Sequence, residues 1–214
     1  TTASSTTLET NAAKLSTSSG SKNGSSSSSG DTYTVAQIAE QCKSSVVAIT
    51  NQSVQEVQTM FGTMQQQSTG SGSGVIIGKN DTELLIATNN HVVSGAESLT
   101  VCFNDDKDAV FDAKIKGTDA DNDLAVIAIK LSDISEDVLN SISVATLGDS
   151  TQMEVGDQVV AIGNALGFGQ SVTSGVISAL DREVTIDDTT ATLMQTDAAI
   201  NPGNSGGALF NMKG

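Results

Sequence analysis

One serine near the end of the chain has the local sequence of an exposed nucleophile. Ser205 stands in Gly203-Asn204-Ser205-Gly206-Gly207, where glycines let the backbone turn sharply and bring its N–H groups close to a substrate carbonyl. A serine hydroxyl attacks a carbonyl only when a neighbouring base removes its proton, and histidine is the usual base. By itself the pentapeptide is equally compatible with an ordinary turn between strands, so its interpretation depends on partners elsewhere.

The chain offers one base and one well-placed acid. Its single histidine, His91, follows the apolar run Leu84 to Ile86 and is therefore expected at the end of a strand. The imidazole needs a buried carboxylate that fixes its tautomer and stabilises its charged form. Asp123 directly precedes the apolar run Leu124 to Ile129, so we expect it as a buried acid at the rim of that strand. These three residues predict nucleophilic hydrolysis of a carbonyl compound.

Other patterns in the same segments are weaker. Asp119, Asp121 and Asp123 have the spacing that begins a calcium loop, but the sixth and twelfth places, which need Gly and Glu, hold Leu124 and Lys130. Residues 163–169 superficially suggest a dinucleotide loop, yet residues 170–174 make a poor start for the helix that must follow. With one histidine and no Cys-x-x-Cys pair, the sequence predicts neither a metal site nor a cofactor.

The order of the three residues separates two classes of hydrolase. The turn at 203–207 also matches the G-x-S-x-G pattern of α/β-hydrolases, in which the acid and the histidine follow the nucleophile. Here nine residues follow Ser205, and none of them is His or Asp. The preceding chain also lacks the alternating helices of a doubly wound sheet. We therefore do not expect an esterase or lipase of that class.

Composition excludes further partners. The 214 residues include 10 Lys and Arg against 25 Asp and Glu, a formal charge of -15, which would repel nucleic acid and anionic lipid surfaces. Apolar runs stay far below the ~18 residues of a membrane-spanning helix. Cys42 and Cys102 are too few for a disulfide framework, and we expect buried free thiols, with a bridge as the alternative.

The chain divides into a linker and two β units. Residues 1–33 are rich in Ser, Thr, Gly and Asn, which predicts a disordered linker. At Thr34 a capping box with Gln37 predicts a short amphipathic helix. Residues 34–140 would then form this helix and a first β unit, and residues 141–214 a second, incomplete one. Both ends of the chain look cut.

From Ser45 onward, short β-branched runs alternate with Gly, Asn and Asp turns, as in a sandwich or barrel. The Met- and Gln-rich stretch 52–73 shows no alternation, so we predict a long mobile surface loop there. Residues 134–139 are expected as a short helical or looped crossover. The predicted strands are 46–50, 74–77, 84–88, 99–103, 110–115 and 124–129, followed by 159–162, 172–179, 184–186 and 192–195.

Taken together, the order His, Asp, Ser and the segments around these residues strongly resemble the HtrA/Deg (DegP-like) family of trypsin-like serine proteases. The resemblance runs from about Thr34 to Gly214, and its most specific part is the stretch that ends in Gly203 to Leu209. Four stretches carry it: Gly72 to Ile77 leading to Thr88 to Val93, then Asp123 to Val126, Val155 to Asn164, and Gln195 to Leu209.

This resemblance implies an all-β fold of two six-stranded antiparallel β-barrels of the trypsin/chymotrypsin type, the second truncated at its C-terminal end. It implies that His91 and Asp123 come from the first barrel and Ser205 from the second, with the site between them. Family members continue beyond the equivalent of Gly214, usually into a peptide-binding PDZ domain that this sequence does not contain.

The resemblance also implies roles for the site residues. Ser205 would be the nucleophile, His91 the general base and then acid, and Asp123 the acid that orients it. The backbone N–H groups of Gly203 and Ser205 would form the oxyanion hole. Ile200 would line the pocket for the residue before the scissile bond and favour small or medium aliphatic side chains.

The implied biology is extracytoplasmic protein quality control, with unfolded or misfolded polypeptides as substrates. The upstream Ser/Thr-rich linker resembles the tether of membrane-anchored bacterial relatives, whose anchor is not in this sequence. Homotrimers are usual in the family, and residues 34–45 are the expected contact region. A peptide-binding, chaperone-like module with little or no turnover is the alternative function.

Overall fold

The computed structural model describes residues 32–59, 62–165, 169–186, 189–201 and 203–214, so almost all of the predicted linker lies outside the described residues. The described chain opens with helix α1 (Val35–Cys42). The Thr34 side chain accepts a hydrogen bond from the Gln37 backbone N–H, and the Gln37 side chain accepts one from the Thr34 N–H. Since both ends of this capping box are formed, the predicted helix start is confirmed.

Six antiparallel strands close into a barrel in the order β1-β2-β3-β6-β5-β4. Strand β3 shows why the sequence folds this way, because its burial alternates residue by residue and turns Leu84, Ile86 and Thr88 inward. The first predicted barrel is therefore confirmed. Its strands are β1 (Val46–Thr59), β2 (Gly62–Lys79), β3 (Glu83–Thr88), β4 (Ser98–Cys102), β5 (Val110–Asp119) and β6 (Leu124–Lys130).

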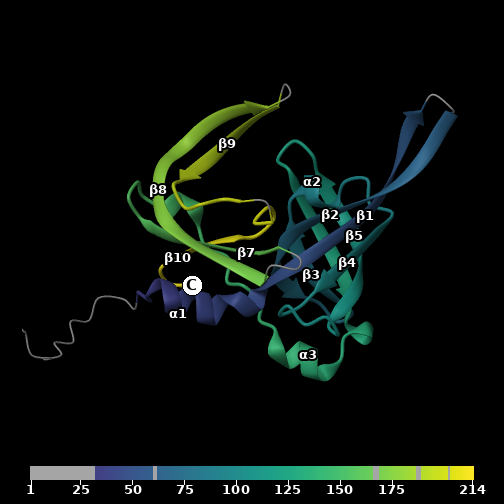
Figure 1. Cartoon of the computed structure of the whole chain (residues 1–214). Coiled ribbons are helices and arrows are strands. Elements are labelled where there is room, and N and C mark those ends of the chain that lie inside the picture. Colours follow the sequence, from purple (N-terminus) through teal and green to yellow (C-terminus); the bar gives the residue numbers. More distant parts are fainter. Residues whose placement is uncertain (1–31, 60–61, 166–168, 187–188, 202) are drawn as a thin grey trace, which may run out of the picture. The chain divides into compact units, whose positions relative to one another are not determined.

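The predicted mobile loop at 52–73 is wrong. Strands β1 and β2 pair one to one from Val46 opposite Val75 to Thr59 opposite Gly62, and the resulting ribbon projects from the barrel (Figure 1). Strand β1 pairs with β4 only from Ala48 to Gln52. Beyond that point no described residue of the ribbon belongs to either apolar cluster, so polar side chains can occupy both of its faces and the alternation that marks a half-buried strand is lost.

The second unit is a four-stranded antiparallel sheet in the order β10-β7-β8-β9. Within the described residues it is open rather than a six-stranded barrel, because its edge strands β10 and β9 do not pair with each other. Residues 184–186 continue β8 instead of forming a strand of their own. The strands are β7 (Gln158–Ala165), β8 (Gly169–Ile186), β9 (Thr189–Thr196) and β10 (Ala208–Asn211).

Short helical segments lie between the strands, most of them in the connection from β6 to β7. The predicted crossover contains helix α3 (Glu136–Ser141), whose Ser135 cap accepts a hydrogen bond from the Val138 N–H. Single-turn 3-10 segments lie at Lys43–Ser45, Leu131–Asp133 and Ser150–Gln152. No helix among the described residues combines the length and apolar character needed to cross a membrane.

Two apolar clusters stabilise the fold. The first fills the barrel and includes Ile76, Ile86 and Ile127, which have no exposed surface. The second joins the barrel to the sheet, because Val46 of β1 packs with residues of α1, β7 and β10. Strand β7 also lies beside β1 and β2. The buried members of the second cluster are Ile38, Cys42, Val46, Val160, Ile162 and Phe210.

The two cysteines are free thiols. Cys42 is buried in the second cluster, as predicted, whereas Cys102 in β4 is only partly buried. Burial raises the pKa of both thiols, and the carboxylates of Asp105 and Asp106 raise that of Cys102 further. Both thiols are therefore protonated at neutral pH.

Candidate active site

His91 and Asp123 are directly joined. Strand β3 ends at Thr88, and His91 lies just beyond it in the single-turn helix α2 (Asn90–Val93). Its ring Nδ1 is 2.7 Å from Asp123 Oδ2, and its backbone N–H donates to Asp123 Oδ1 over 2.8 Å. Because an ionised carboxylate only accepts, Nδ1 must carry the proton, which leaves Nε2 of the neutral ring as an acceptor.

Asp123 is held through its backbone as well. It occupies the turn before β6 with a φ of 51°, a left-handed conformation in which Asp is tolerated better than most residues. Its carbonyl oxygen accepts from the Asn90 N–H over 3.0 Å and from the Asn89 side-chain Nδ2 over 2.8 Å. Both ends of the residue are thus fixed against the segment 89–91.

The expectation of a buried acid is wrong for the described residues. The side chains of Asp123 and His91 are 44% and 56% exposed. The reason is their location, since a turn at the rim of the barrel leaves one side of the carboxylate open to water. The pair therefore relies on its short, two-point geometry for orientation rather than on burial.

The turn around Ser205 depends on its glycines. Gly203 and Gly206 have φ values of 104° and 80°, which residues with a Cβ rarely adopt. The Asn204 N–H donates to Asn201 O over 3.0 Å, and the Gly207 N–H donates to Asn204 O over 2.8 Å. The N–H groups of Gly203 and Ser205 donate to no acceptor among the described residues. They are available to an external oxygen.

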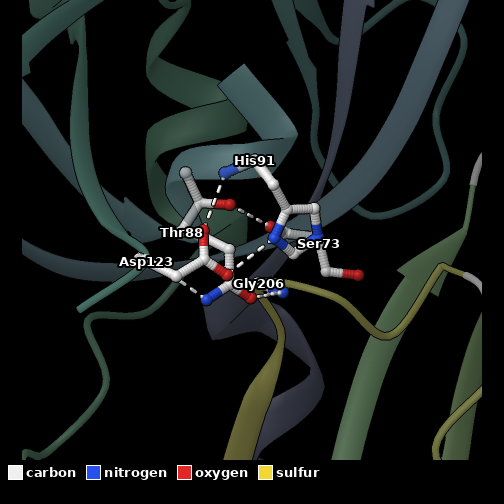
Figure 2. Close-up of polar contacts among 6 residues, drawn as sticks. Ser73, Thr88, His91, Asp123 and Gly206 are labelled. Atoms are coloured by element: carbon white, nitrogen blue, oxygen red, sulfur yellow. Dashed lines mark hydrogen bonds and ion pairs between the residues drawn. The ribbon is translucent and has the colours of Figure 1, made fainter. Parts of the chain in front are cut away.

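Hydrogen bonds from Ser73 and Asn89 join this turn to the barrel. The Ser205 carbonyl accepts from the Ser73 N–H of β2 over 2.7 Å. The Gly206 N–H donates to Asn89 Oδ1 over 2.7 Å. The Asn89 side-chain amide therefore contacts both the backbone carbonyl of Asp123 and the turn around Ser205, and Figure 2 shows Gly206 of this turn near the His91–Asp123 pair.

The structure brings the predicted residues together unequally. His91 and Asp123 are hydrogen-bonded, whereas no hydrogen bond links the Ser205 hydroxyl to the His91 ring within the part of the chain that the structure describes. Ile200 lies before the nucleophile turn and is 60% exposed. Its apolar side chain is therefore open to solvent and not packed into either core.

Sequence analysis assigns no role to two residues that the structure places at the site, Ser73 and Asn89. Ser73 is fully buried and contacts the turn, and Asn89 links that turn to Asp123. A signal for Ser73 exists in its flanking glycines. A Cβ at Gly72 would lie 2.7 Å from Val92 and 3.1 Å from the Ser205 carbonyl, and such close backbone approach is a common reason for glycine in a strand.

A barrel that carries a His–Asp pair, next to a sheet that carries a glycine-flanked serine, defines the class of trypsin-like serine endopeptidases. A family model described as a trypsin-like peptidase domain matches residues 72–214. The match covers more than half of the chain, so the chain belongs to this family. Relatives to which the chain is similar are named serine proteases of the HtrA and Deg types.

The first of these relatives is the serine protease Do-like HtrA of Bacillus subtilis (strain 168), which is 40% identical over 195 residues, covering 86% of this chain and 41% of the relative. The periplasmic pH-dependent serine endoprotease DegQ of Escherichia coli (strain K12) is 43% identical over 145 residues, covering 68% of this chain and 30% of the relative. The chain thus spans less than half the length of these proteins.

Solved structures of a protease of the same type are also similar to this chain. The HtrA-type protease AlgW with a decapeptide superposes with a TM-score of 0.65 at 33% identity, over 84% of this chain and 56% of that one. The same protease with a tripeptide gives a TM-score of 0.65 at 35% identity, over 84% of this chain and 51% of that one.

Proposed function

We propose that the chain is the protease part of an HtrA-type serine endopeptidase whose catalytic residues are His91, Asp123 and Ser205. The observation that carries the proposal is the two-point contact between His91 and Asp123, with ring and backbone nitrogens at 2.7 and 2.8 Å from the two carboxylate oxygens. This contact fixes the ring in the tautomer that a general base needs.

The proposed mechanism follows from these groups. His91 Nε2 removes the Ser205 hydroxyl proton as Oγ bonds to the substrate carbonyl carbon, and the carbonyl π electrons move to oxygen. The free N–H groups of Gly203 and Ser205 stabilise this oxyanion. His91 then protonates the leaving amine as the C–N bond breaks, and water releases the acyl group by the same steps. Asp123 stays ionised throughout and stabilises the imidazolium.

The proposed substrates are unfolded or misfolded polypeptides. Solved relatives hold a decapeptide and a tripeptide, which supports an extended peptide as ligand. The exposed apolar side chain of Ile200 supports cleavage after small or medium aliphatic residues. Several relatives, DegQ of Escherichia coli among them, are named periplasmic, which supports an extracytoplasmic location and a role in envelope quality control.

The proposal includes features of the whole protein. A homotrimer assembled through residues 34–45, an upstream membrane tether and a following PDZ domain are expected from the family resemblance. Helix α1 supports the first of these, because its outward residues, among them Ala36, Gln37 and Glu40, are exposed and available to a partner.

One observation favours the second candidate, a chaperone-like module without turnover. Large apolar side chains are exposed on the second sheet and its loops, and they could hold unfolded segments. They include Val155 at 64%, Val172 at 40%, Leu193 at 47%, Met194 at 40% and Leu209 at 41% exposure.

The decisive test is cleavage of casein by the full natural polypeptide, with the cut sites mapped by mass spectrometry. Ser205→Ala should lower kcat by at least about 10⁴-fold, and cuts by the unmodified enzyme should follow aliphatic residues. Ser71→Ala is the matched control, since Ser71 is exposed and has no side-chain partner among the described residues. Binding of casein without cleavage by any variant would support the chaperone-like module instead.

A further inference from the structure

A buried serine in the first barrel contacts the nucleophile turn at two points. Ser73 of β2 has no exposed surface. Its hydroxyl donates to the Gly203 carbonyl over 2.5 Å, and its backbone N–H donates to the Ser205 carbonyl over 2.7 Å. The same hydroxyl accepts from the Asn164 N–H of β7 over 2.6 Å. A single residue therefore links the barrel, the second sheet and the turn.

These contacts orient two peptide groups that flank the nucleophile. The peptide between residues 203 and 204 is held at its oxygen by the Ser73 hydroxyl and at its nitrogen by Asn201 O. The peptide between residues 205 and 206 is held at its oxygen by the Ser73 N–H and at its nitrogen by Asn89 Oδ1. With both flanking peptides fixed, the direction of the Ser205 N–H is determined as well.

Ser73 itself has little freedom to move. Its carbonyl oxygen accepts from the Thr88 hydroxyl over 2.7 Å, as Figure 2 shows. On either side, a Cβ at Gly72 would lie 2.7 Å from Val92, and one at Gly74 would lie 2.7 Å from Ile86. The barrel wall is thus packed closely around the serine, so its hydroxyl is a fixed reference point for the turn.

We propose that the Ser73 hydroxyl is a positioning group that holds Gly203 and Ser205 with their N–H groups directed at the oxyanion. It touches no substrate atom and acts only through the turn. The inference rests on the proposed function, because an oxyanion hole matters only if Ser205 attacks a carbonyl. Without the hydroxyl, the Gly203 carbonyl and the Asn164 N–H lose their partner, and the peptide of residues 203 and 204 is held only at its nitrogen, by Asn201 O.

The test uses a fluorophosphonate probe, whose phosphorus bonds to serine Oγ as fluoride leaves and the serine proton passes to the base. The probe needs the nucleophile and the oxyanion hole but no peptide-binding surface. Rates are measured for the unmodified protein, Ser73→Ala, Ser73→Thr and the control Ser71→Ala, which lies two residues earlier in the same strand and is exposed. All variants are made in the full natural polypeptide.

We expect Ser73→Ala to lower kinact by at least about tenfold and to leave KI unchanged. This loss should be smaller than the ~10²–10³-fold loss of rate caused by removing an oxyanion donor itself. Ser73→Thr, which keeps the hydroxyl, should recover most of the loss. A merely structural serine would lower the melting temperature without this separation of kinact from KI. If Ser73→Ala does not fold, Ser73→Cys takes its place, since a thiol is a weak donor of similar shape.

Two results would overturn the inference while leaving the proposed function intact: labelling of Ser73→Ala or Ser73→Cys as fast as the unmodified protein, or equal losses in the Ala and Thr variants. Absence of labelling in the unmodified protein, with Ser205 unreactive, would overturn the proposed function itself. The two failures are therefore distinguishable in one set of measurements.

Discussion

The barrel and the second sheet differ in whether their strands close on one another. The six barrel strands close on one another and bury a continuous core. Within the described residues the sheet has the order β10-β7-β8-β9 and does not close, and large apolar side chains such as Leu193 and Leu209 are exposed there. The closed unit carries His91 and Asp123, and the open one carries Ser205.

The candidate site accordingly has two parts. The His91–Asp123 pair is held by contacts within the barrel, whereas the turn around Ser205 is held partly by contacts from the barrel. The His91–Asp123 contact needs only barrel residues. The turn around Ser205 takes three of its backbone contacts from the barrel, two through Ser73 and one through Asn89. Changes at the junction should therefore affect Ser205 while leaving His91 and Asp123 paired.

The largest effect on kcat is expected from a change in the His91–Asp123 pair. Asp123→Asn should lower kcat by ~10⁴-fold, because an amide Nδ2 cannot accept the Nδ1 proton and the ring adopts the wrong tautomer. Stability should change little, since the carboxylate is half exposed. Peptide-cleavage kinetics and thermal unfolding measure the two quantities. Asp121→Asn, an exposed neighbour, is the control, and activity of Asp123→Asn equal to the unmodified enzyme would remove Asp123 from the mechanism.

A second change breaks the junction itself. A Cβ at Gly206 would overlap the Ser73 carbonyl and the Thr88 hydroxyl, and its φ of 80° is strained for alanine. Gly206→Ala should cost roughly 1–3 kcal/mol of stability from strain alone, and a displaced turn should lower kcat by about 10²-fold. Denaturant unfolding and casein cleavage measure these effects.

Gly117 provides the control for this change. A Cβ at Gly117 in β5 meets nothing within 4 Å, so Gly117→Ala should leave activity unchanged and stability equal or higher. Full activity of Gly206→Ala would show that activity does not depend on the close packing of the turn against Ser73 of β2.

A smaller effect is expected from the amide that spans the junction. Asn89 donates to Asp123 O at one end and accepts from the Gly206 N–H at the other. Asn89→Ala should lower kcat about fivefold, since one positioning hydrogen bond is worth roughly 1 kcal/mol. Asn89→Asp should do no better, because it lacks the donor. The control is Asn140→Ala on the exposed face of α3; equal kcat in all three variants would argue against the bridge.

The smallest effect concerns the thiols of the two regions. Because burial raises the folded-state pKa of Cys42 and Cys102, each favours folding at neutral pH, and that contribution is lost as the pH rises through the folded pKa. Alkylation by iodoacetamide should be slow at pH 7, accelerate at alkaline pH, and reach Cys102 before the more buried Cys42. Faster labelling of Cys42 would show that the cluster joining the two units opens first.

The sequence predicted the barrel well because its strands are half buried. The alternation in β3 and the apolar run of β6 are visible without coordinates. It failed for the ribbon of β1 and β2, where pairing comes from backbone hydrogen bonds and neither face covers a core, so side-chain type carries no signal. It failed again for the degree of burial of Asp123, which depends on what surrounds the barrel rim.

The candidate site was predictable only in part. Residue type and order indicate His91, Asp123 and Ser205, because few side chains can act as base, acid and nucleophile. Ser73 and Asn89 are common polar residues, and their importance comes from partners 130 and 117 positions away in the chain. Such long-range contacts leave no local pattern, apart from the glycines that flank Ser73.

The ribbon of β1 and β2 also bears on how such a protein can change over generations. Its pairing is one to one along the whole length, and beyond Gln52 neither strand pairs with another strand among the described residues. Adding or removing equal numbers of residues in the two arms would therefore preserve the register at Ser73 and the barrel. The length of the ribbon can therefore change among descendants without altering the contacts at its base.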